Sequence, residues 1–107
     1  MEPFDVFIVY SPWESGGKSR PVLAYIIDGD KFYFYQITTQ YENKSTTIKN
    51  QYFKITDWQQ AGLNKPSYID IGTLLKLPLS VTKNKSPIGK LTQADKKRLL
   101  EFLARRA

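Results

Sequence analysis

The 107-residue sequence contains no cysteine and no histidine. Without cysteine, the chain has neither a disulfide framework nor a thiolate metal site. Without histidine, it lacks the usual metal ligand and the usual general acid–base group, so any catalysis must use other side chains. We therefore expect no metal site and no cofactor.

Long apolar runs are also missing. The run from Phe4 to Tyr10 is too short to span a bilayer or to form the core of a signal peptide, and it follows the acidic residue Glu2. We expect neither a membrane segment nor a signal peptide.

Acidic residues are scarce in the last third of the chain. Residues 76–107 contain 9 basic and 2 acidic side chains, a net charge of +7, whereas residues 1–75 contain 7 basic and 8 acidic side chains, a net charge of −1. A basic end on a nearly neutral body suggests a polyanion or an acidic protein as partner. The alternative is that these lysines and arginines only keep the surface solvated.

The residues that are plentiful favour a β-rich core. Hydrophobic residues make up 41% of the chain, which holds 7 Tyr, 6 Phe and 2 Trp. A chain of this length forms one domain, residues 1–107, and buries roughly 65% of its unfolded surface.

In the first half of the chain, β-branched and aromatic residues predict strands over Phe4–Tyr10, Val22–Ile27 and Lys31–Thr39. Asp28-Gly29 predicts a hairpin turn between the last two of these. The period of two in the third strand places Thr38 on the face that carries Phe32, Phe34 and Gln36, and it places Thr39 on the opposite face.

In the second half, we expect strands over Thr47–Ile55, Ser67–Ile71 and Ile88–Leu91. Gly72-Thr73 should break the second of these. The run from Leu74 to Val81 contains Pro78, which indicates an edge strand or an irregular one.

Two capping patterns predict helices. Thr56 followed by Gln59 has the form of a capping box, for a short helix that Gly62 ends. Thr92 caps the one substantial helix, which runs to about Arg105, and its expected buried stripe comprises Leu99, Leu100, Phe102 and Leu103. The predicted fold is therefore mainly β (α+β): a small β-barrel with a short internal helix and a C-terminal α-helix.

The stretch from Ser15 to Tyr25 is the most informative one for function. Its glycines and serines form a segment whose backbone can approach a ligand closely. Arg20 follows, immediately before Pro21 and a buried strand. Such a guanidinium suits a phosphate or a carboxylate, which it binds through two parallel hydrogen bonds. The alternative is an ordinary hairpin loop whose arginine pairs with a nearby acid.

Several motifs, in their order along the chain, resemble the MazF/PemK family of bacterial type II toxins, and the PemK-like branch in particular. After the acid-containing first strand (Asp5-Val6), they are the glycine–arginine–proline loop Gly17–Pro21, the strand end Ile37–Gln40, the segment Asp57–Ser67, and Ile88–Leu91 before a capped helix. Each motif alone is weak, but the ordered set is fairly specific and covers nearly the whole chain.

The resemblance implies an SH3-like barrel, usually dimeric, that cleaves single-stranded RNA without a metal. It implies Arg20 and Thr38 as the catalytic residues, a cytoplasmic location and growth arrest through mRNA cleavage. It also implies a cognate acidic antitoxin, whose complex with the toxin binds DNA. The chain departs from members that use a histidine in the first loop. Asp70 stands where some members have an arginine, and Gly72 stands where they have an acid.

Further side chains are candidates for contacting RNA. Trp13 and Tyr41 offer rings on which unpaired bases can stack, although ordinary packing is the more common explanation for any one such ring. The remaining candidates are polar or basic and can follow the RNA backbone: Lys18, Ser19, Gln40, Lys44, Lys83 and Lys85.

Two other functions stay open on the sequence. One is a catalytically inactive SH3-like barrel that binds RNA or an acidic peptide through the same surface. The other is a purely structural subunit of a larger complex, which would neither cleave nor retain RNA.

Overall fold

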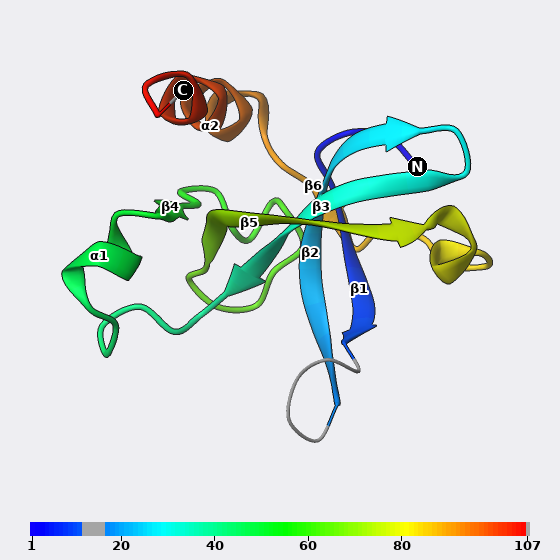
Figure 1. The fold of residues 1–107 in the computed structure, drawn as a ribbon, viewed down its shortest axis with the longest axis horizontal. Coiled ribbons are helices and arrows are strands. Elements are labelled where there is room, and N and C mark those ends of the chain that lie inside the picture. Colours follow the sequence, from blue (N-terminus) through cyan, green and yellow to red (C-terminus); the bar gives the residue numbers. More distant parts are fainter. Residues whose placement is uncertain (12–16, 107) are drawn as a thin grey trace.

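The computed structural model describes residues 1–11 and 17–106 of the chain. Over these residues it is mainly β: one antiparallel open sheet with a C-terminal helix (Figure 1). The sheet has the strand order β4-β5-β3-β2-β1-β6. Its strands are β1 (Asp5–Ser11), β2 (Lys18–Asp28), β3 (Lys31–Thr38), β4 (Tyr52–Lys54), β5 (Tyr68–Pro78) and β6 (Gly89–Lys90). The helical elements are α1 (Thr46–Lys49), the 3-10 turn η1 (Leu79–Thr82) and α2 (Gln93–Ala104).

The hairpin between β2 and β3 is confirmed. Asp28 pairs with Lys31, so Gly29 and Asp30 form the two-residue turn. Gly29 has a φ of 63°, which a glycine at the first central position of such a turn adopts without strain. The register shifts by one residue at a bulge between Ala24 and Ile26, and this shifted register later aligns Arg20 with the end of β3.

Each face of the sheet carries its own apolar cluster, because alternate residues of β3 point to opposite faces. Tyr35 and Ile37 belong to the larger cluster, which also contains Leu99 of α2. Phe32 and Phe34 belong to the other, against which Leu75, Leu77 and the 3-10 turn pack. The two sides of one strand are therefore both buried between its charged first residue, Lys31, and the polar residues toward its end.

The strand β5 corrects one expectation. The predicted break at Gly72-Thr73 is wrong, because the strand runs without interruption from Tyr68 to Pro78. Its register against β3 shifts between Phe34 and Gln36, so the irregularity is a bulge rather than an end. Pro78 closes the strand, where the missing N–H of proline is tolerated.

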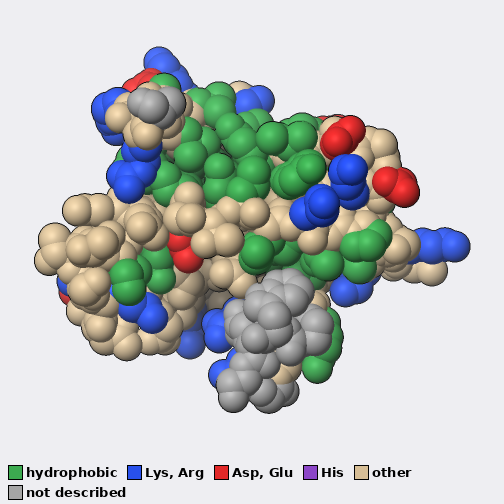
Figure 2. All heavy atoms as spheres, viewed as in Figure 1, with side chains coloured by type: hydrophobic (Ala, Val, Ile, Leu, Met, Phe, Trp, Pro, Cys, Tyr) green, Lys and Arg blue, Asp and Glu red, His purple; other side chains and the backbone are tan. Residues whose placement is uncertain are grey.

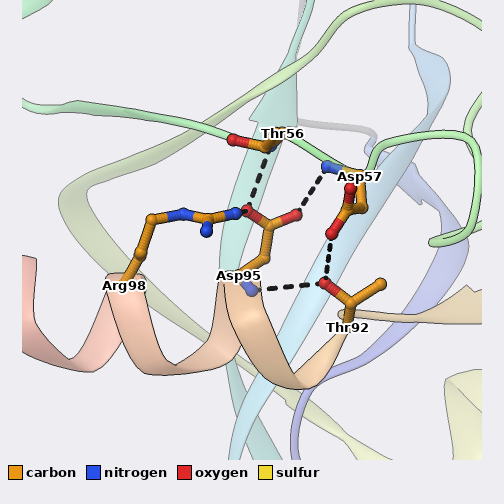
Figure 3. A network of polar contacts seen from close by, with 5 residues as sticks. All are labelled: Thr56, Asp57, Thr92, Asp95 and Arg98. Atoms are coloured by element: carbon orange, nitrogen blue, oxygen red, sulfur yellow. Dashed lines mark hydrogen bonds and ion pairs between the residues drawn. The ribbon is translucent and has the colours of Figure 1, made fainter.

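The helix α2 begins as predicted and is held by a buried carboxylate (Figure 3). Thr92 caps it by accepting a hydrogen bond from the Asp95 N–H at 3.2 Å. The Asp95 side chain is fully buried and accepts hydrogen bonds from the backbone N–H groups of Thr56 (3.1 Å) and Asp57 (2.7 Å), and from Arg98. This network ties α2 to the segment that follows β4.

Two predictions for the middle of the chain are wrong. The first part of the expected strand Thr47–Ile55 is the helix α1, because the Ser45 hydroxyl accepts a hydrogen bond from the Ile48 N–H at 3.3 Å and caps it. The segment from Thr56 to Gly62 forms turns instead of a helix. The short internal helix therefore lies before β4 and not after it.

One residue of the predicted helix stripe is also misplaced. Leu100 is 41% exposed, whereas Leu99 is buried and Phe102 and Leu103 are partly buried. Figure 2 shows hydrophobic side chains gathered on the surface between α2 and the β2–β3 hairpin.

None of the helices in the described part of the chain combines the length and the apolar character needed to cross a membrane.

Candidate functional site

A polar pocket of about 170 Å³ lies where β2, β3, β4 and β5 meet. Its lining residues are Arg20, Gln36, Ile37, Thr38, Gln40, Lys44, Tyr52 and Asp70. They come from four strands and from the loop between β3 and α1, so the pocket exists only in the folded sheet.

Strand register explains why these side chains meet. Gln36 of β3 lies opposite Asp70 of β5, and Asp70 lies opposite Tyr52 of β4. Directly opposed residues of an antiparallel sheet share a face, so these three side chains form one polar row. On the other side of β3, Val22 lies opposite Gln36, and continuing that register brings Arg20 beside Thr38.

The pocket continues the sheet face that buries Phe32 and Phe34 farther along β3. Side chains two residues apart on a strand share a face, so Gln36 and Thr38 replace phenylalanine where the strand reaches the edge of the core. The same face is thus apolar near the hairpin and polar near α1. This places polar groups on a well-packed strand, which holds them in fixed positions.

The Thr38 hydroxyl is oriented by its own loop. Its oxygen accepts a hydrogen bond from the Gln40 backbone N–H at 3.0 Å. With this acceptor position used, the hydroxyl proton is left for another group in the pocket. The loop after β3 therefore sets the direction in which Thr38 can donate.

Asp70 supplies the carboxylate of the pocket. Its Oδ1 accepts a hydrogen bond from the Gly72 backbone N–H at 2.9 Å, and this bond fixes the side chain on its own strand. Beside it, burial first and the negative charge of Asp70 second raise the pKa of the Tyr52 phenol above its ordinary value. Tyr52 therefore keeps its proton at neutral pH. The pocket combines two cationic side chains, one carboxylate, one hydroxyl and one phenol.

The structure brings together four of the residues that the sequence singled out: Arg20, Thr38, Gln40 and Lys44. It does not place the others in this pocket. Lys18 and Ser19 are exposed at the start of β2, where they pair with Ser11 and Tyr10. Trp13 lies outside the described residues.

Lys83 and Lys85 follow the 3-10 turn η1, at the opposite side of the molecule from α1 (Figure 1). The Lys85 Nζ donates a hydrogen bond to the backbone oxygen of Ile8 at 3.2 Å. These two lysines were expected to follow the RNA backbone. Neither lysine lines the polar pocket.

A second, open pocket of about 400 Å³ adjoins the first along the same loop. Its lining residues are Thr39, Tyr41, Glu42, Lys65, Pro66 and Tyr68. Tyr41 and Tyr68 stack with their ring centroids 4.3 Å apart and their planes 9° apart. Tyr52 of the polar pocket lies 6.2 Å from Tyr41 and 6.4 Å from Tyr68, centroid to centroid, so the two pockets share an aromatic wall.

Sequence reasoning did not assign a role to Gln36, Tyr52 or Asp70. Gln36 was placed on the correct face, and Asp70 carries a recognisable signal, a carboxylate between the apolar residues Ile69 and Ile71. Tyr52 carries no such signal, because only the pairing of β4 with β5 brings it to the pocket.

Comparison with protein-family models, with curated proteins and with solved structures finds no match to this chain. Among the described residues, no group of three or more aspartate and glutamate side chains comes together in a way that could hold a metal ion.

Proposed function

We propose that this protein is an endoribonuclease that cleaves single-stranded RNA without a metal and acts as the toxin of a type II toxin–antitoxin pair in the cytoplasm. The observation that carries the proposal is that Arg20 and Thr38 line one pocket. These are the two residues that the resemblance to the MazF/PemK toxins implies for cleavage. Their approach through the β2–β3 register is independent of that resemblance.

Arg20 stabilises the negative charge that develops on the phosphate. The 2′-hydroxyl of the RNA attacks the adjacent phosphorus, and charge builds up on the two non-bridging oxygens. A guanidinium can bind both oxygens in parallel. Lys44 lies in the same pocket, so two cations outweigh the single carboxylate of Asp70 and keep the pocket attractive to a phosphate. Loss of a positioned donor of this kind typically costs about 10²–10³ in rate.

Thr38 orients the attack. Because its oxygen already accepts the Gln40 N–H, its proton is directed to an oxygen of the substrate. A threonine hydroxyl is too weakly basic to remove the proton of the 2′-hydroxyl. Its contribution is to hold the attacking group in line with the bond that breaks.

Asp70 and Tyr52 complete the acid–base chemistry. Asp70 accepts the proton of the 2′-hydroxyl as the new bond between the 2′-oxygen and phosphorus forms. The bond from phosphorus to the 5′-oxygen breaks, and the Tyr52 phenol donates a proton to that oxygen. The products are a 2′,3′-cyclic phosphate and a 5′-hydroxyl. A phenol with a raised pKa is a slow acid, so this site predicts slow turnover dominated by positioning.

The open sheet is best described, in this proposal, as an SH3-like small barrel. The bulged strand β5 bends across the sheet, and the 3-10 turn that follows it packs against the apolar cluster containing Phe7 and Val9 of β1. The bond from Lys85 to the Ile8 oxygen joins the same two regions. In this proposal β5 curls back toward β1, and these contacts support the closure that a small barrel requires.

Two partners follow from the proposal. The apolar surface beside α2 is suited to a second copy of the chain, which supports a homodimer (Figure 2). A toxin that acts on cellular RNA also has to be neutralised, and the polar pocket with its cations is suited to an acidic antitoxin segment. RNA and antitoxin would then compete for Arg20.

The test is incubation of the purified protein with mixed single-stranded RNAs in the presence of a chelator. Cleavage by the wild-type protein that is lost in Arg20→Ala supports the proposal. Retention of RNA without cleavage by either protein overturns it in favour of a catalytically inactive binding module. Neither retention nor cleavage overturns it in favour of a structural subunit.

A further inference from the structure

We infer that the second pocket binds a guanine base of the RNA, next to the phosphate held at Arg20. The inference rests on the proposed function only for the ligand class, single-stranded RNA, and not on its cleavage. The volume of about 400 Å³ is within the range of about 300–1,000 Å³ that small-ligand sites occupy. The first pocket is smaller and more polar, which suits a phosphate group.

The two pockets lie side by side, as the phosphate and the base of one nucleotide do. Along the loop after β3, Thr38 and Gln40 line the polar pocket, while Thr39 and Tyr41 line the second one. Tyr52 reaches the rings of the second pocket from the first. A nucleotide whose phosphate lies at Arg20 can therefore direct its base along this loop into the second pocket.

The aromatic wall provides the stacking surface. Tyr41 has Tyr68 stacked on its ring and the Lys49 ammonium 4.9 Å from its ring centre, so its faces are already in use. A base therefore extends the stack on Tyr68, and Tyr41 supports that ring from behind. Burial raises the pKa of the Tyr68 phenol, with further contributions from Glu42 and Tyr41, so the ring stays neutral. Tyr41 was expected to stack on a base directly, and this geometry gives that role to Tyr68.

The polar residues of the pocket select the base. Glu42 presents a carboxylate whose side chain is 89% exposed and whose ion pair with Lys49 is long, at 3.9 Å, so it can turn to a ligand. Guanine alone among the four bases offers two adjacent donors, its N1–H and its 2-amino group, to the two oxygens of a carboxylate. Lys65, on the same pocket, supplies a donor for the acceptor groups on the other edge of guanine.

The test measures binding of short 2′-O-methyl RNAs, which cannot be cleaved, that differ at a single position carrying guanine, inosine, adenine, cytosine or uracil. Guanine should bind about 5- to 100-fold more tightly than inosine, which lacks the 2-amino group. Glu42→Gln should remove most of this preference, because one oxygen is replaced by a donor. Since Glu42 is exposed, the variant keeps the fold. Glu101→Gln, an exposed carboxylate of α2, is the matched control and should leave the preference intact.

Tyr68→Leu provides the second variant and should weaken binding of every base by about 5- to 100-fold through loss of stacking. Equal affinity for all five bases, or an unchanged guanine preference in Glu42→Gln, overturns the inference. Guanine preference in a protein that cleaves no RNA supports the inference and overturns the proposed function. Cleavage without guanine preference overturns the inference and supports the proposed function.

Discussion

The buried Asp95 makes a sharp prediction about stability (Figure 3). In Asp95→Ala, the backbone N–H groups of Thr56 and Asp57 lose their acceptor in a part-buried site. Each unsatisfied buried donor costs about 1–3 kcal/mol. Arg98 is 45% exposed and can be solvated by water, so losing its ion pair with Asp95 adds little to the destabilisation. Allowing up to about 0.7 kcal/mol for the better helix propensity of alanine, the net destabilisation is about 1–5 kcal/mol.

The assay is urea unfolding followed by circular dichroism, together with a thermal scan. For a chain of this size, the expected loss lowers the melting temperature by at least about 5 °C. Asp95→Asn keeps one acceptor oxygen and should fall between the wild type and Asp95→Ala. Glu101→Ala removes an exposed carboxylate from the same helix and should change stability by no more than about 0.5 kcal/mol. If Asp95→Ala and Glu101→Ala were equally stable, the network would not hold α2 in place.

The remaining predictions concern the two pockets. Thr38→Val should slow RNA cleavage with little change in stability. Thr39→Val, which changes the lining of the second pocket, should slow cleavage less than Thr38→Val does. The reverse order would show that the wrong threonine faces the phosphate. Arg20→Lys should restore little of the activity lost in Arg20→Ala, measured as initial cleavage rates, because a point charge does not reproduce the guanidinium fork. The free energy of unfolding should fall as the pH rises through 10.0, because Tyr52 and Tyr68 ionise at a higher pH in the folded than in the unfolded chain. If the free energy of unfolding, measured with urea, did not change between pH 9 and about 11, the raised pKa values would be contradicted. RNA affinity should fall with salt with a slope of log K against log salt of roughly −2 to −3, for three or four phosphate contacts, and a salt-independent affinity would exclude a phosphate site.

Local signals in the sequence account for the elements that were predicted correctly. Gly29 marks the hairpin, and Thr92 marks the start of α2, because a turn and a cap each depend on a few neighbouring residues. The strand expected from Thr47 failed for a related reason. β-branched residues favour strands, but the single bond from the Ile48 N–H to the Ser45 hydroxyl begins a helix there.

The residues of the candidate site also differ in whether a local sequence pattern singles them out. Arg20 and Thr38 were predicted because each lies in a short recognisable motif. Tyr52 and Asp70 were not, since their approach depends on the β4–β5 and β3–β5 registers. A register between strands distant in sequence is set by the packing of the whole sheet and leaves no local pattern.

The central claim is that this pocket directs the RNA's own 2′-hydroxyl at the neighbouring phosphate. The most direct measurement compares a cleavable RNA with the same RNA carrying one 2′-deoxy substitution at the cleaved position, in chelator. The account predicts that the all-RNA substrate yields 2′,3′-cyclic phosphate and 5′-hydroxyl ends, and that the substituted RNA is not cut at that position. Equal cleavage of both RNAs, or products with a 3′-hydroxyl and a 5′-phosphate, would contradict it.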